Sequence, residues 1–120
     1  MKKFATVALG LMLATGLAGY LLAADSAAEK SVTGTLEDSY CYGSMGAKGA
    51  SHKQCAIACV KKGIPVALVD TNGNIHILLP AKNDQPLPDD VYSKMEDQVT
   101  VTGKEYSKGG VNFLTAESVK

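Results

Sequence analysis

The chain has 120 residues, with twelve lysines, no arginine and twelve acidic residues, so its formal net charge is zero. Arginine is the side chain that most often reads phosphates and base edges, so its absence argues against nucleic acid as a partner. No long run of one charge suggests a membrane-surface patch. The length suits one small domain. Such a domain buries only about 60–65% of its unfolded surface, so we expect a disulfide or a bound metal to add stability.

Residues 1–24 have the pattern of an export signal. Lys2 and Lys3 precede an apolar stretch over 4–24 that ends in small residues. We therefore predict a periplasmic or secreted protein, with residues 25–30 as a linker. The stretch is nearly as long as the roughly 20 apolar residues that a helix needs to span a bilayer. An uncleaved N-terminal anchor is therefore the alternative. Such an anchor is the only membrane contact that we expect.

The first predicted strand begins at Ser31 in SVTGTLEDSYCY, and we expect a bend at Glu37 and Asp38. A glycine-rich stretch, GSMGAKGA, then leads to a predicted helix over 51–62. Ser51 and Gln54 have the spacing of a capping box at its start. Gly63 is the expected left-handed stop.

Four further strands follow the predicted helix. IPVALVD and NIHILLP form a hairpin around Asn72-Gly73, and QVTVTGKEY and GVNFLTAESV form a second pair. DDVYSKMED, between these pairs, predicts a short helix. Within NIHILLP, we expect His76 to face solvent or the rim of a barrel. The order predicts a mainly β domain over 31–120: a small five-stranded barrel with a helical insert between strands 1 and 2 and a short helix between strands 3 and 4.

This order of elements is similar to that of the oligonucleotide/oligosaccharide-binding (OB) barrel. The Val-Thr-Gly sequences at 32–34 and 101–103 also resemble those of small exported OB-like proteins of bacteria. The resemblance extends over about residues 31–119 and implies a fold rather than a function. Tyr40, Tyr42 and Phe113 are too few to form the aromatic platform of a nucleic-acid-binding OB domain.

The residues that carry chemistry are Cys41, His52, Cys55 and Cys59. On a helical wheel, His52 and the last two cysteines share a face of about 140° with Ala56 and Val60. Cys41 is joined to this helix only by the glycine-rich stretch. All four side chains can therefore meet where the helix folds back over the end of the first strand.

Three interpretations of this cluster remain open. Cys41 can form a structural disulfide with Cys55 or Cys59, which are poorly placed to pair with each other at i, i+4 on a helix. Three thiolates and an imidazole can instead bind zinc or, with fewer ligands, Cu(I). Thiol redox chemistry is the third interpretation, although no Cys-x-x-Cys motif is present.

We favour an exported, non-catalytic binding protein with a soft-metal site, zinc or copper, at Cys41, His52, Cys55 and Cys59, because this interpretation uses all four residues. Its expected partners are the metal ion or a periplasmic protein. The alternative is a disulfide-stapled interaction or ligand-binding module without a metal.

Overall fold

The computed structural model describes residues 27–120. The predicted export signal and the first part of the predicted linker lie outside the described residues. The first strand begins at Glu29, inside the linker predicted for 25–30. Across residues 27–120, no helix combines the length and the apolar character that crossing a bilayer requires.

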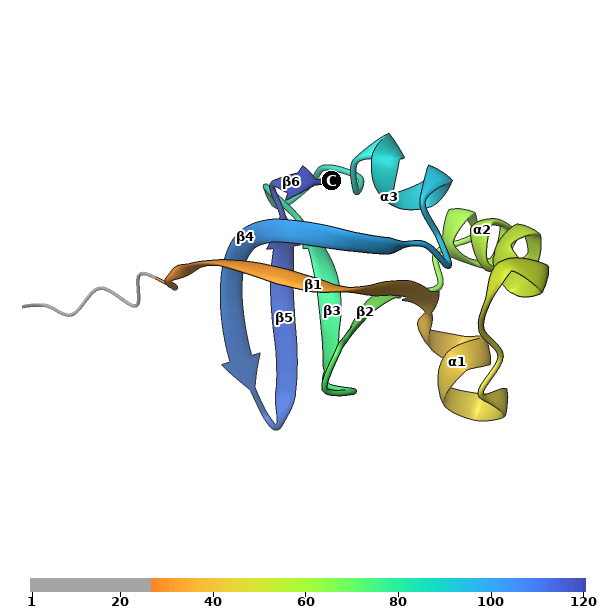
Figure 1. Cartoon of the computed structure of the whole chain (residues 1–120). Coiled ribbons are helices and arrows are strands. Elements are labelled where there is room, and N and C mark those ends of the chain that lie inside the picture. Colours follow the sequence, from red (N-terminus) through yellow and green to blue (C-terminus); the bar gives the residue numbers. More distant parts are fainter. Residues whose placement is uncertain (1–26) are drawn as a thin grey trace, which may run out of the picture.

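Six strands and four short helices make up the described chain (Figure 1). In chain order they are β1 (Glu29–Asp38), α1 (Ser39–Met45), the 3-10 helix η1 (Ala50–His52), α2 (Lys53–Lys61), β2 (Val66–Asp70), β3 (Ile75–Pro80), α3 (Asp89–Ser93), β4 (Gln98–Lys108), β5 (Val111–Ala116) and β6 (Ser118–Val119). Three of the helices therefore lie between β1 and β2, and the fourth lies between β3 and β4.

The strands close into a barrel. Hydrogen bonding follows the order β1-β2-β3-β5-β4, and β4 pairs again with β1. All neighbours are antiparallel except β3 and β5, which are parallel. The mainly β class and the five-stranded barrel are thus confirmed. The small sixth strand, β6, was not expected and pairs with the outer edge of β4.

β1 is the strand that closes the barrel, because its two halves have different partners. Its first half pairs with β4, where Val32 faces Val101, and its second half pairs with β2, where Leu36 faces Leu68. Gly34 belongs to both ladders, and a Cβ there would overlap the carbonyl oxygen of Val69. Glycine is therefore required where the strand passes from one partner to the other.

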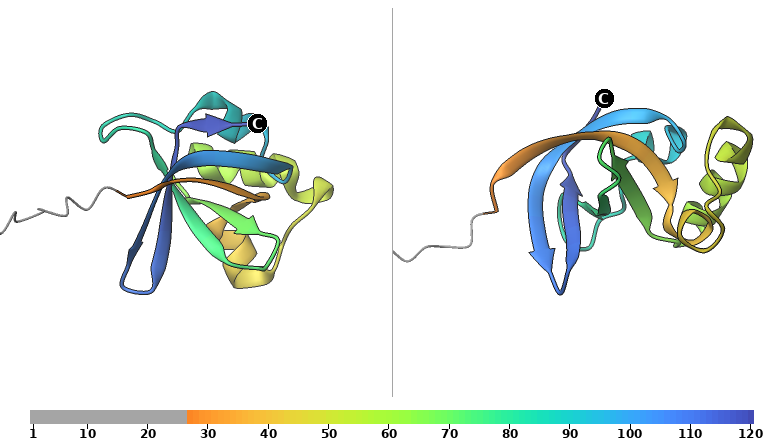
Figure 2. Two further views of the ribbon diagram at one scale, coloured as in Figure 1. Left: turned by 60° about the vertical axis from the view of Figure 1, so that its left-hand side comes forward. Right: turned by 60° about the horizontal axis from the view of Figure 1, so that its bottom comes forward.

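The core fills the barrel and the end of it that the helices cover. Alternate residues of the strands point inward, as the period of two requires, and the fully buried ones include Leu36, Leu68 and Leu114. Val91 and Met95, at α3 and just after it, are also fully buried. Ala56 and Val60 attach α2 to the same core. Figure 2 shows α1 and α2 beside the end of β1, away from the β4–β5 hairpin.

The structure corrects the sequence-based account of the helical insert. Residues 39–45 form a helix, α1, where an extended segment and a flexible loop were predicted, so Cys41 lies on a helix. The predicted capping box of Ser51 and Gln54 is wrong, because α2 begins at Lys53, with His52 rather than Ser51 at its N-cap and no side-chain cap. The stop at Gly63 is right: its φ is +103°, and its N–H donates to the carbonyl of Val60.

The expectation that His76 faces solvent is also wrong. Its side chain is buried between two carboxylates, with Nε2 at 3.1 Å from Asp70 Oδ2 and Nδ1 at 3.2 Å from Glu105 Oε2. Lys30 in turn pairs with Glu105 at 2.8 Å. These contacts link residues of β1, β2, β3 and β4 around a buried histidine whose Nδ1 makes no hydrogen bond to any other described residue.

Candidate metal centre

Cys41 is held in place by the turn that ends β1. Asp38 is the N-cap of α1, and its Oδ1 accepts a hydrogen bond from the backbone N–H of Cys41 at 2.8 Å. An aspartate in this position satisfies one of the free N–H groups of the first helical turn. Gly46, with a φ of +66°, closes the other end of this short helix. The thiol of Cys41 is buried as a result.

Cys55 and Cys59 lie one turn apart on α2. Ala56 and Val60, their immediate neighbours, point into the core, so the adjacent face of the helix carries the two thiols. Burying a valine side chain contributes roughly 1.5–3 kcal/mol, which helps to fix the rotation of so short a helix. Cys55 is exposed to solvent and Cys59 is half-buried.

The two helices bring the three sulfur atoms together. The Sγ atoms of Cys41, Cys55 and Cys59 all lie within 4.8 Å of one another. All three residues are free thiols. Tetrahedral zinc–thiolate bonds of about 2.3 Å require sulfurs this close. These residues are therefore positioned to hold a metal ion.

His52 takes part through a second, overlapping group. Its Nε2 lies 2.7 Å from Oδ2 of Asp38, whose side chain is completely buried, while the imidazole itself is 13% exposed. One atom each from Asp38, Cys41 and His52 lie within 4.8 Å of one another. Cys41 therefore belongs to both groups, and the Asp38 carboxylate contacts both Cys41 and His52.

The surroundings of the site raise the pKa of two of its thiols. Burial raises the pKa of Cys41 to about 12, and a hydrogen bond to Asp38 and the negative charges of Asp38 and the other thiols add to this. Burial also raises the pKa of Cys59, followed by a hydrogen bond with Cys55. A metal ion must therefore displace protons from these thiols when it binds.

The pKa of Asp38 is shifted in the opposite direction to those of the thiols. Burial alone raises the pKa of its carboxyl group, but hydrogen bonds from the backbone and thiol of Cys41 and from His52 outweigh burial and hold the pKa below its ordinary value. The carboxylate is thus ionised at neutral pH and keeps its two partners in place.

Two further acids, Glu37 and Glu96, are buried near Asp38. Glu37, next to Asp38 on β1, is only 3% exposed, and its carboxyl group hydrogen-bonds to that of Glu96. The other oxygen of Glu96 accepts a hydrogen bond from the backbone N–H of Gly49 at 2.6 Å, at the start of η1. This pair therefore anchors the segment that leads to His52. Burial, followed by the hydrogen bond and the charge of Glu96, raises the pKa of Glu37 to about 8.

The raised pKa of Glu37 predicts that the metal-free protein loses stability between about pH 4.5 and pH 8. In this range the folded protein keeps the Glu37 proton, whereas the unfolded chain releases it, so the free energy of unfolding falls as the pH rises. Glu37→Gln keeps a donor and removes the titration. We expect this variant to be more stable than the wild type at pH 8 by ~2 kcal/mol, after an allowance for solvent screening. Urea unfolding at pH 5, 6.5 and 8 measures the difference, and a wild-type stability that is constant or rises over this range contradicts the prediction.

Asp38 is the site residue that the sequence analysis missed. It was interpreted as a bend residue, yet it is the contact between Cys41 and His52. Its position three residues before Cys41 is the spacing of an N-cap, which is a signal that the sequence contains. Of the residues predicted as ligands, the three cysteines form one group, and His52 joins only Cys41 in the other.

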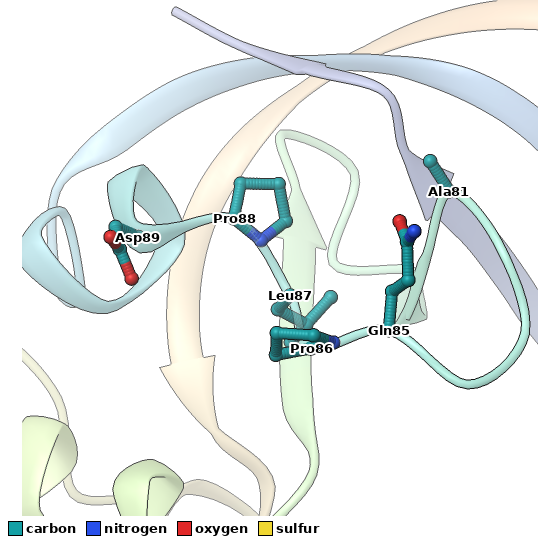
Figure 3. Close-up of a pocket in the computed structure, with 6 residues that line it drawn as sticks. All are labelled: Ala81, Gln85, Pro86, Leu87, Pro88 and Asp89. Atoms are coloured by element: carbon teal, nitrogen blue, oxygen red, sulfur yellow. The ribbon is translucent and has the colours of Figure 1, made fainter.

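Three surface pockets formed by residues 27–120 have no cysteine in their lining. The loop that leads from β3 to α3 lines a pocket of about 460 Å³ with Pro86, Leu87 and Pro88, with Ala81 and Gln85 on one side and Asp89 on the other (Figure 3). Its lining combines apolar rings with one amide and one carboxylate and holds no cluster of reactive side chains. The cysteine cluster is accordingly the best-supported functional site within residues 27–120.

Comparison with known proteins returns no match for this chain: no family model fits it, and no curated protein or solved structure is significantly similar to it. The function is therefore argued from the site itself.

Proposed function

We propose that this protein is an exported, non-catalytic binding protein that holds one soft transition-metal ion, zinc or copper, and stores it or passes it on. The observation that carries the proposal is the convergence of three thiols from α1 and α2 to within 4.8 Å of one another. Thiolates prefer soft and borderline ions, so this set of donors favours zinc or copper over magnesium or calcium.

The surroundings of the thiols also support metal binding. The segment 39–63 contains Lys48, Lys53, Lys61 and Lys62 and no acidic residue. Lys53 pairs with Asp97 at 2.6 Å, and the segment as a whole adds net positive charge to the part of the chain that supplies the three thiols. Cys55 lies in the first turn of α2 and is exposed to solvent, so an incoming ion can reach it.

The OB-like assignment of the barrel belongs to the same proposal. It is supported by the closed order β1-β2-β3-β5-β4 and by the position of α3 between β3 and β4. Export is supported by the pattern of residues 1–24 in the sequence.

Native mass spectrometry of the protein purified without added metal, with and without a chelator, tests the function. We expect one ion of zinc or copper per chain, which the chelator removes, and three alkylatable thiols once the ion is gone. A metal-free protein whose mass is two hydrogen atoms below that of the fully reduced chain, with one alkylatable thiol, contains a disulfide. This result supports the disulfide-stapled module instead of the metal-binding protein. Cys41 is then the expected partner of Cys55 or Cys59, since it is the only one of the three on a different helix.

A further inference from the structure

We propose that the three sulfurs form a three-coordinate site selective for Cu(I), in which His52 is a positioning residue rather than a fourth ligand. This inference rests on the proposed function, and it names both the ion and the number of its ligands.

The first argument is that the thiols and the imidazole are not one group. The three sulfurs are mutually close, whereas His52 is close only to Cys41 and Asp38. Zinc in closed sites takes four protein ligands in tetrahedral geometry. Cu(I) is softer and is stable with thiolates alone at a lower coordination number. Three converging sulfurs without a fourth converging donor therefore favour Cu(I).

The second argument is what holds His52. Its Nε2 is 2.7 Å from Asp38, and that carboxylate is completely buried and also accepts a hydrogen bond from Cys41. A histidine that binds a metal often places its other ring nitrogen on a carboxylate. Here, however, neither ring nitrogen falls within the group of three sulfurs. Moving the ring toward them strains or breaks the contact with Asp38, and an unpaired buried carboxylate oxygen is costly.

The third argument is the access to the site. Cys41 is buried and Cys55 is exposed, so an ion enters from the side of α2 that faces solvent. An open coordination position on the exposed side lets an incoming thiolate or thioether take over the ion by ligand exchange.

Competition with a Cu(I) chelator tests the assignment. Bicinchoninic acid, with reductant and without oxygen, competes for Cu(I) with the wild type, Cys59→Ser, His52→Gln and the control Lys108→Ala, which changes an exposed lysine at the end of β4. We expect Cys59→Ser to lower the Cu(I) association constant at least about 100-fold, because it removes a ligand. His52→Gln is expected to lower it less than about tenfold, below the about 10–100-fold that the hydrogen-bond partners of a metal ligand typically contribute. Equal losses in Cys59→Ser and His52→Gln overturn the proposal.

Cobalt(II) bound to the wild type and to His52→Gln gives a second readout. Cobalt(II) held by three thiolates in a tetrahedral site absorbs strongly at visible wavelengths, whether the fourth ligand is a histidine or water. We expect the same bands in the wild type and in His52→Gln, because water rather than the imidazole fills the fourth position. Strong tetrahedral bands in the wild type that are lost in His52→Gln show a four-ligand zinc-type site. In that case this inference fails while the proposed metal-binding function stands, whereas failure to bind cobalt, zinc and copper alike refutes both.

Discussion

Cys41→Ser is expected to lower the affinity for the metal ion at least about 100-fold, more than any other single substitution in the cluster. Cys41 belongs to both groups of closely spaced donors, and it is the only thiol supplied by α1. Without it, two thiols one turn apart on α2 remain, and a serine hydroxyl is a poor ligand for soft ions. Competition with a chromophoric chelator measures the loss, which exceeds the about 10–100-fold typical of an outer-shell partner.

Ser44→Ala is the matched control for this substitution. Ser44 lies on the same short helix, and its hydroxyl donates to the carbonyl of Tyr40 at 2.6 Å on the exposed side. We expect its metal affinity to stay within about twofold of the wild type, because an exposed hydroxyl bonded to its own helix has no part in the site. A Cys41→Ser protein that is folded and binds as tightly as Ser44→Ala would show that the sulfurs do not act together.

Gly103→Ala is expected to destabilise the barrel by about 3 kcal/mol or more, the largest effect on folding that we predict. Gly103 lies in β4, and a Cβ there would overlap the carbonyl oxygen of Thr115, in a neighbouring strand. The obstacle is backbone rather than a flexible side chain, so the strands must separate. Lys104 donates its N–H to the hydroxyl of Thr115 at 2.7 Å, and this contact is expected to be lost as well. Thermal unfolding should shift down by on the order of 10 °C.

Gly43→Ala is the control for the glycine substitution. Gly43 lies inside α1, its φ is not in the left-handed region, and a Cβ there meets nothing within 4 Å. Alanine is favoured over glycine within a helix by roughly 0.5–1 kcal/mol, so this variant should be as stable as the wild type or slightly more stable. If Gly103→Ala unfolds at the same temperature as Gly43→Ala, the close approach of β4 to Thr115 is not present in solution.

The barrel was predictable because its signals are local. Alternating apolar residues place Val32, Leu36, Leu68 and Leu114 inside, and Asn72-Gly73 marks the hairpin between β2 and β3. The small strand β6 was missed because two residues, Ser118 and Val119, carry no periodicity.

The site was only partly predictable, because long-range contacts complete it. The spacing of Cys55 and Cys59 correctly placed both thiols on one helix. The helix, however, buries the neighbouring Ala56 and Val60, so Cys55 is exposed to solvent and does not point into the core as predicted. Asp38 and Glu37 look like ordinary bend residues in the sequence, and only the folded chain places them against His52 and Glu96. Acidic residues are rarely buried without a partner, and no local pattern identifies the partner.

X-ray absorption at the edge of the bound metal tests the central claim most directly, because it counts the sulfur atoms around the ion. The protein loaded with one equivalent of metal is predicted to give three metal–sulfur contacts, at about 2.3 Å if the ion is zinc. A shell of nitrogen and oxygen, or fewer than three sulfurs, would contradict the claim that Cys41, Cys55 and Cys59 bind one ion together.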